Sequence, residues 1–192
     1  MSTLELKELS HPAGEVIKIA SGKTLDLKTQ GSVTMPTGSV LQIVGNVTTT
    51  QLQQTATTTD AIVNGLSKAI VPKGANSKFL VTVRWFGECD SAWGIMFNIH
   101  MNSSRVNSSG GRGHGLATPQ QSYIANDNDS TPESVCFSTL VSSSSSIGTS
   151  ITFSFVFDSN SSVTFWNNRC YGTPSVSAEQ GSSEIIITEI QG

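Results

Sequence analysis

A small group of planar polar side chains carries the clearest recognition chemistry in this chain of 192 residues. Aromatic faces stack on sugar rings, and Asn and Arg form directional hydrogen bonds with hydroxyl or acidic groups. Trp166 follows Phe165 on an alternating stretch, so its side chain is expected to point away from the core that Phe165 faces. The candidate binding residues are Arg112, His114, Tyr123, Trp166, Asn168 and Arg169. Alternatively, Trp166 and Trp93 fill a subunit interface, where aromatic residues are also enriched.

The sequence lacks the usual signatures of catalysis. Its histidines, His11, His100 and His114, have no metal-ligand spacing, and no Gly-x-Ser-x-Gly nucleophile elbow occurs. Glycoside hydrolysis needs two carboxylates across a cleft, whereas the fourteen acidic residues are scattered and Asp158 is expected to begin a hairpin turn. We therefore expect a non-enzymatic protein with no metal and no cofactor.

The long Gly/Asn/Ser segment at residues 102–133 is too long for a simple hairpin loop, and such loops are usually functional or disordered. Within it, residues 126–130 offer clustered oxygen ligands for a cation such as calcium, but no EF-hand glutamate or glycine follows. The glycine-rich run at residues 110–115 lacks the Lys-Ser/Thr pair of a phosphate-binding P-loop. Neither motif therefore predicts an established type of site.

The composition favours β structure and argues against several partners. The chain contains 30 Ser and 21 Thr, and only 13% of its residues are charged, which suits strands and turns better than helices. With a net charge of −3 and no Lys/Arg cluster, nucleic acid is not expected as a partner. We expect neither a signal peptide nor a membrane span. Three distant cysteines indicate reduced thiols, and one disulfide plus one free thiol is the alternative.

A short repeat occupies the first quarter of the chain. Pairs of apolar residues that bracket one polar or small residue recur every eight positions and alternate with turn formers, which is typical of very short strands. One copy cannot bury the resulting apolar stripe, so the pattern predicts an intertwined oligomeric stem over residues 1–45. A β-meander that packs on its own head domain is the alternative. The two apolar series are Leu9, Ile17, Leu25, Val33 and Leu41, and Ile19, Leu27, Met35 and Ile43.

From residue 46 onward, longer alternating stretches predict a β-sandwich head over residues 46–192. Apolar residues alternate within 79–85, 95–101, 135–141 and 151–157, and a hairpin through residues 158–161 is expected to lead into Val163 and Phe165. The run 184–190 is apolar on both faces, which indicates a central strand or one buried between subunits. At least seven strands without a convincing helix predict an all-β antiparallel sandwich that is jelly-roll-like.

The segments 17–27 and 31–44 resemble the short β stem of tail-fibre proteins from marine phages, such as those that infect cyanobacteria. The segments 94–104, 150–157, 163–169 and 184–190 resemble strands of the sandwich head in the same family. The resemblance implies a homotrimer in the virion tail whose head attaches to the host cell surface. It also implies other phage tail proteins as partners and assembly in the bacterial host cytoplasm.

Three functions remain open on the sequence alone. The first is a structural tail-fibre or tip protein that binds a host-surface glycan or protein. The second is a lectin-like carbohydrate-binding module, and the third is a glycan depolymerase. The stem repeat favours the first function over the second, because a free lectin needs no fibrous neck. The absence of paired carboxylates disfavours the third, although a depolymerase site can form between subunits.

Overall fold

A computed structural model describes residues 21–23, 35–57, 60–90, 94–107, 114–118, 132–143, 147–171 and 179–192 of the chain. The chain divides into two units, residues 1–34 and residues 35–192. The repeat residues from Leu9 to Val33 lie outside the described part, so the predicted stem remains a prediction. No helix that could span a membrane occurs among the described residues.

The second unit is an all-β fold, as the hydroxyl-rich composition predicts. Its strands are β1 (Val40–Thr48), β2 (Leu52–Ala56), β3 (Ala61–Ile70), β4 (Lys78–Cys89), β5 (Ile95–Met101), β6 (Ser104–Arg105), β7 (Glu133–Ser142), β8 (Ile151–Ser159), β9 (Val163–Asn167) and β10 (Ser183–Ile190). Every strand predicted from alternation is present within a few residues of its expected bounds. The Thr/Gln-rich run after β1 contains the short strand β2.

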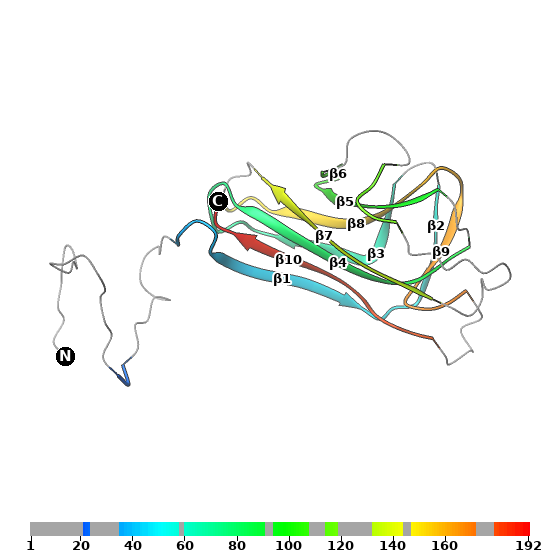
Figure 1. Ribbon diagram of the computed structural model, residues 1–192, viewed down its shortest axis with the longest axis horizontal. Helices are drawn as coiled ribbons and strands as arrows, with labels where there is room; N and C mark the ends of the chain where they lie inside the picture. The colour runs from blue at the N-terminus through cyan, green and yellow to red at the C-terminus, as the bar shows by residue number, and fades with distance from the viewer. Residues whose placement is uncertain are drawn as a thin grey trace. The chain divides into compact units, whose positions relative to one another are not determined.

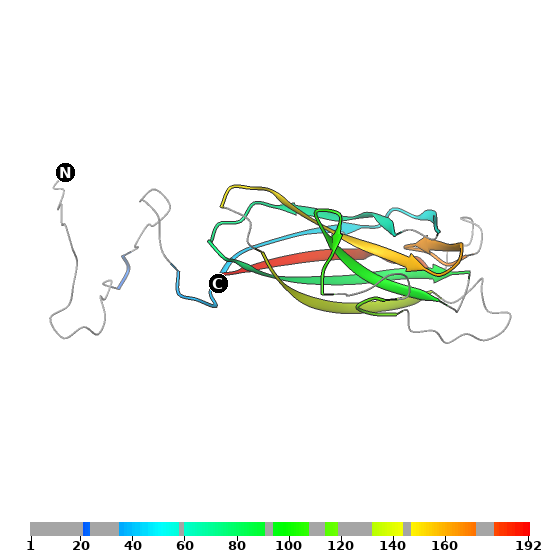
Figure 2. The ribbon, with the colours of Figure 1, turned by 90° about the horizontal axis from the view of Figure 1, so that it is seen from above.

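The strands form two antiparallel sheets that face each other, as Figures 1 and 2 show. Sheet A has the order β1-β10-β4-β9-β2 with β7 on the other side of β4, and sheet B has the order β3-β8-β5-β6. Successive strands of the chain mostly alternate between the sheets, so most connections cross from one sheet to the other. The predicted β-sandwich is confirmed at this level.

Strand β4 is the longest strand and organises sheet A. One edge pairs with β7 along Lys78–Gly87, and the other edge pairs first with β10 and then with β9. Gly87 lies where β9 meets β4, and a Cβ atom at this position would approach the Trp166 carbonyl oxygen to 2.1 Å. Only glycine therefore permits both neighbours to pair with this strand. Strand β10 lies between β1 and β4, which confirms the predicted central position of the run 184–190.

The core consists of large side chains from the inner faces of both sheets. Trp85 of sheet A lies 5.5 Å from Phe97 and 5.3 Å from Phe157 of sheet B between ring centroids. All three side chains are fully buried, and each such burial contributes about 1.5–3 kcal/mol to stability. The indole nitrogen of Trp85 donates a hydrogen bond of 2.7 Å to Asn167 Oδ1, so its one polar atom is satisfied inside the core.

The hairpin predicted at residues 158–161 is wrong. Strand β8 belongs to sheet B and β9 to sheet A, so this turn carries the chain from one sheet to the other. Phe157 and Phe165 flank the turn and stack across the sandwich with centroids 4.1 Å apart. Asp158 is therefore the outward neighbour of a core residue on β8 and does not begin a hairpin turn. Burial of both rings decides this path, because a hairpin would keep them in one sheet.

The predicted boundary between residues 45 and 46 is also displaced. Strand β1 runs continuously across it and pairs with β10 from Val40 to Thr48. Leu41 and Ile43, assigned from the sequence to the stem, therefore belong to the sandwich, whose compact unit begins at Met35. The open edge of β10 explains the difference, because its backbone groups need a partner strand.

The buried carboxylate of Glu189 stabilises one end of the sandwich. At this end the chain enters the sandwich near Gly38 and leaves it at Gln191. Glu189 accepts hydrogen bonds from Ser77 Oγ and Gln42 Nε2, both 2.6 Å long, and from two backbone amides of the β3–β4 connection. Burial alone would raise the pKa of Glu189, but these bonds together hold the pKa below its ordinary value. At the same end, Gly38 N donates to Gln191 O at 2.8 Å, so the entering and leaving chain segments lie together (Figure 1).

We expect Glu189→Gln to destabilise the fold by about 2–4 kcal/mol at pH 7, because the new amide turns N–H groups toward buried donors. The loss should shrink in acid, since the contribution of a carboxylate with a lowered folded-state pKa disappears as pH falls through that pKa. Urea unfolding measures both effects. Glu184→Gln on the same strand is the control, because Glu184 makes only a part-exposed ion pair with Arg84; an equal loss in both variants would contradict the prediction.

Candidate functional site

The outer face of sheet B carries an open pocket with polar walls. Outward positions of β3, β8 and β5 place Ser67, Ser154 and His100 in one row across three strands. Ser67 Oγ donates to Ser154 Oγ at 2.8 Å. The pocket has a volume of about 480 Å³ and is lined by Ile62, Ser67, His100, Asn102, Ser103, Thr152 and Ser154. Hydroxyl, imidazole and amide groups therefore share its surface with apolar atoms, including those of Ile62.

A tight turn between β5 and β6 forms one wall of the pocket. Asn102 and Ser103 both have positive φ, 49° and 70°, as the two central residues of a tight hairpin turn with the right twist do. The Asn102 side chain accepts a hydrogen bond of 2.9 Å from Thr152 N, and Asn102 N donates to Thr152 O at 2.9 Å. These bonds attach the turn to β8, so the wall is part of the rigid sheet.

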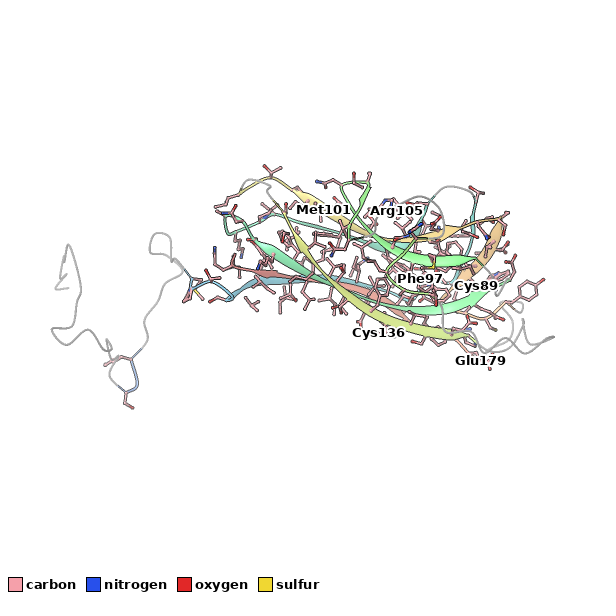
Figure 3. The ribbon with its side chains drawn as sticks, turned by 45° about the horizontal axis from the view of Figure 1, so that its top comes forward. Cys89, Phe97, Met101, Arg105, Cys136 and Glu179 are labelled. Atoms are coloured by element: carbon pink, nitrogen blue, oxygen red, sulfur yellow. The ribbon has the colours of Figure 1, made fainter. Side chains whose placement is uncertain are left out.

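A network of ionised side chains lies beside the pocket. His100 Nε2 lies 2.7 Å from Asp60 Oδ2, and Arg105 Nε donates to the same oxygen at 2.8 Å. The Arg105 guanidinium also contacts Asp60 Oδ1, and it lies 3.0 Å from Asp158 Oδ2. Figure 3 shows Arg105 on sheet B, far from Cys136 on sheet A. The guanidinium of Arg105 on β6 thus bridges carboxylates from two adjacent strands of sheet B, Asp60 just before β3 and Asp158 on β8.

Contacts within the network shift the pKa values of Asp60 and Arg105 in opposite directions. Burial alone would raise the pKa of Asp60, but the hydrogen bonds and positive charge of Arg105, with those of His100, hold it below its ordinary value. The bond to Asp60 in turn raises the pKa of Arg105. The carboxylate of Asp60, itself held by the Arg105 guanidinium, therefore keeps His100 in a fixed position at the pocket. A preorganised polar surface of this kind suits a neutral ligand rich in hydroxyl groups.

Two of the residues predicted to bind a receptor are buried on sheet A. Trp166 does point away from the core of Phe165, but only 4% of it is exposed, because Tyr171 packs edge-on against it with centroids 4.5 Å apart. Asn168 is fully buried; its Nδ2 donates to Thr50 O at 2.9 Å and its Oδ1 accepts from Ser183 Oγ at 2.7 Å. The prediction that Trp166 and Asn168 are exposed is therefore wrong. Tyr171, which follows β9, packs over Trp166 on the outer side of sheet A.

The other predicted binding residues do not gather with them. His114 is exposed at the edge of sheet B, where its carbonyl oxygen accepts hydrogen bonds from Asn98 Nδ2 at 3.1 Å and Arg105 Nη1 at 3.2 Å. Arg169 is half-buried and forms a backbone bridge with Gln180. Arg112 and Tyr123 lie outside the described residues. The structure thus brings only His114, through its backbone, close to the network around Asp60.

A second cluster of titratable side chains, Glu88, Cys89 and Glu133, lies on sheet A where β4 ends and β7 begins. Burial and the negative charge of Glu88 raise the pKa of Glu133 to about 7. Glu88 is buried, and its Oε2 accepts a hydrogen bond of 2.5 Å from Tyr171 N. Burial and three carboxylates, those of Glu133, Asp90 and Glu88, also raise the pKa of the Cys89 thiol, so this thiol stays protonated and unreactive. The sequence showed only scattered acids, but the register of β4 and β7 brings Glu88 and Glu133 together.

Sequence reasoning missed the residues of the pocket. His100 was read as structural, Asp158 as a turn residue, and Asp60 and Arg105 received no role. The alternation of Asn98 and His100 with buried apolar residues on β5 marked an outward polar face. Nothing local indicated that Asp60, 40 residues earlier, would meet His100.

No group of three or more His, Cys, Asp or Glu residues that could hold a metal ion occurs in the described part of the chain. The described cysteines, Cys89, Cys136 and Cys170, are all free thiols, as the first reading of the sequence expected. Comparison with known proteins gave no family assignment: no protein-family model and no curated protein matches the chain.

We expect Asp60→Asn to destabilise the protein by about 1–3 kcal/mol at neutral pH, because Arg105 and His100 lose their shared acceptor charge. The stabilising contribution of Asp60 is present above its ordinary pKa and is lost as pH falls through the lowered pKa. The difference between wild type and variant should therefore begin to shrink below about pH 4 and vanish only below the lowered folded-state pKa of Asp60. Denaturant unfolding across pH tests this, with Asp90→Asn as an exposed control; a constant difference at every pH would contradict it.

Glu133→Gln should have the opposite pH dependence. Because folding raises the pKa of Glu133, the contribution of this one group to stability is fully present below pH 4.5 and is lost as pH rises through about 7. At pH 8 the variant should be the more stable protein by about 1–2 kcal/mol, after allowance for the solvent that reaches this side chain. Thermal unfolding at pH 5 and pH 8 measures the effect. Glu179→Gln, at an exposed position, should leave the profile unchanged.

Proposed function

We propose that this protein is a structural subunit of a phage tail, a fibre or tip protein that attaches to the host cell surface by binding a glycan in the pocket on sheet B. The observation that carries the proposal is the open pocket lined by Ser67, Ser154, Thr152, Asn102 and His100. Its hydroxyl, amide and imidazole groups match the donors and acceptors of a sugar. The pocket has the volume of a typical small-ligand site, which lies between about 300 and 1,000 Å³.

The position of the two ends of the sandwich supports an attachment role. The entering segment at Gly38 and the leaving segment at Gln191 are hydrogen-bonded at one end. The chain therefore enters and leaves the sandwich at the same end. An arrangement of this kind suits a head carried on a stem. We propose in addition that the sandwich is a jelly roll and that the protein assembles as a homotrimer with other tail proteins in the virion.

A lectin-like module would bind a glycan in the same pocket. Both functions therefore predict the same binding of polysaccharide. The depolymerase alternative has one specific observation in its favour. His100 contacts Asp60 at 2.7 Å and lies opposite Ser154 across β5 and β8. A hydroxyl, an imidazole and a carboxylate in this order have the composition of a hydrolytic triad. Hydrolysis would release reducing ends from a bound polysaccharide, whereas an attachment protein would leave the polysaccharide intact.

We expect the full-length protein to bind a subset of bacterial lipopolysaccharides and capsular polysaccharides on an array. Thr152→Arg should reduce this binding at least tenfold, because the larger side chain fills an exposed position in the pocket wall. Thr149→Arg, at an exposed position outside the pocket lining, is the matched control and should bind as wild type.

An array without any bound polysaccharide, or equal binding by Thr152→Arg and wild type, would contradict the proposed site. Release of reducing ends from a bound polysaccharide would establish the depolymerase alternative. Loss of that release in His100→Ala, with the fold intact by circular dichroism, would assign the reaction to this pocket.

A further inference from the structure

The outer face of sheet A is apolar, in contrast with the polar outer face of sheet B. Five large apolar side chains on three strands of this face are more than a third exposed. They are Val40 at 52%, Ile43 at 63%, Val47 at 61%, Leu80 at 37% and Leu140 at 49%. Single exposed apolar residues are ordinary on protein surfaces, but a contiguous group marks an interaction site.

The strand register shows that these residues are contiguous. Ile43, Thr188, Leu80 and Leu140 lie directly opposite one another across β1, β10, β4 and β7. The next row consists of Gly45, Ile186, Thr82 and Ser138, whose side chains are mostly small. The resulting surface is flat and has no bulky polar group at its centre.

The charges on this face are nearly balanced. Arg84 and Glu184 form an ion pair of 3.1 Å with each other. Lys78 adds one positive charge at the end of the face near the C-terminus. A second apolar surface could therefore cover the face without burying an isolated charge, which would be costly.

The preceding chain indicates what covers the face. Met35 and Ile43 are the last members of one eight-residue series, and both are exposed, at 40% and 63%. The apolar stripe that predicts packing between stem copies thus continues into β1 on the sandwich. Ile43 and Val47 are thus exposed on the strand that ends this series.

The size of the face agrees with a contact that continues beyond the sandwich. Four strands about 4.8 Å apart and seven residues of about 3.4 Å each give an area of about 450 Å². Each partner in a standard interface buries about 800 Å². The face therefore supplies about half of the area that each partner buries in a standard interface.

We propose that a second copy of this chain covers the outer face of sheet A, with Ile43, Leu80 and Leu140 at the centre of the contact. The inference rests on the homotrimer of the proposed function and deepens it by naming the surface through which the copies meet. It does not depend on the glycan pocket, which lies on the opposite sheet.

Cys136 provides a built-in probe of this surface. It is the exposed one of the three described cysteines, and it lies opposite Arg84 on the outer face of sheet A. Figure 3 shows Cys136 on β7, on the side of the sandwich away from Arg105. Cys89 and Cys170 are buried, so reaction of the native protein with a maleimide reports mainly on Cys136.

The test measures mass by light scattering and the maleimide reaction rate on the full chain. We expect an oligomer in which Cys136 reacts at least tenfold more slowly than in Leu80→Arg, which should be monomeric. Leu140→Arg should behave in the same way, since both positions are exposed enough to accept Arg in a folded monomer. Ile147→Arg is the matched control, because Ile147 is 59% exposed but lies in the β7–β8 connection. It should remain oligomeric and protected.

Measurements on the wild type decide the inference even where a variant fails to fold. A monomer with rapidly reacting Cys136 would overturn it, and so would an oligomer with the same rapid reaction, since the copies would then meet elsewhere. A monomer with slowly reacting Cys136 would also overturn it and would assign the cover to the chain's own first 34 residues. Polysaccharide binding by monomeric Leu80→Arg is recorded separately, so failure of the interface and failure of the glycan site are distinguishable.

Discussion

The contact between aromatic rings of the two sheets is the interaction on which the rest of the fold depends. Trp85 from sheet A packs against Phe97 and Phe157 from sheet B, and Phe157 stacks on Phe165. Because these rings fill the interior, they fix which face of every strand points inward. The crossing of the chain from β8 to β9 follows from the same constraint, since Phe157 and Phe165 meet only if their strands lie in opposite sheets.

A filled interior leaves two outer faces, and the chain gives them opposite chemistry. Sheet B carries Ser154, His100 and the network around Asp60, whereas sheet A carries Ile43, Leu80 and Leu140. The first surface suits a ligand rich in hydroxyl groups and the second suits an apolar protein surface. The proposed division of labour, attachment on one sheet and assembly on the other, keeps the two contacts from competing for the same surface.

Buried charge occurs where chain segments distant in the sequence must be held together. Glu189 gathers Gln42, Ser77 and the backbone of the β3–β4 connection at one end of the sandwich. Arg105 and Asp60 do the same across sheet B. At the opposite end of the sandwich, burial and the negative charge of Glu88 instead raise the pKa of Glu133. The protein thus contains carboxylates whose ionisation stabilises the fold and one whose ionisation opposes it.

The sequence alone determined the all-β class, the strands β4, β5 and β7 to β10, and most of their inward residues, because alternation with a period of two is a local property of extended chain. The central position of the run 184–190 followed in the same way. Only the tertiary structure decided that Trp166 and Asn168 are covered, that β1 belongs to the sandwich, and that Asp60, His100 and Arg105 meet at one pocket. These outcomes depend on the order of strands within each sheet, and that order brings together residues separated by tens of positions.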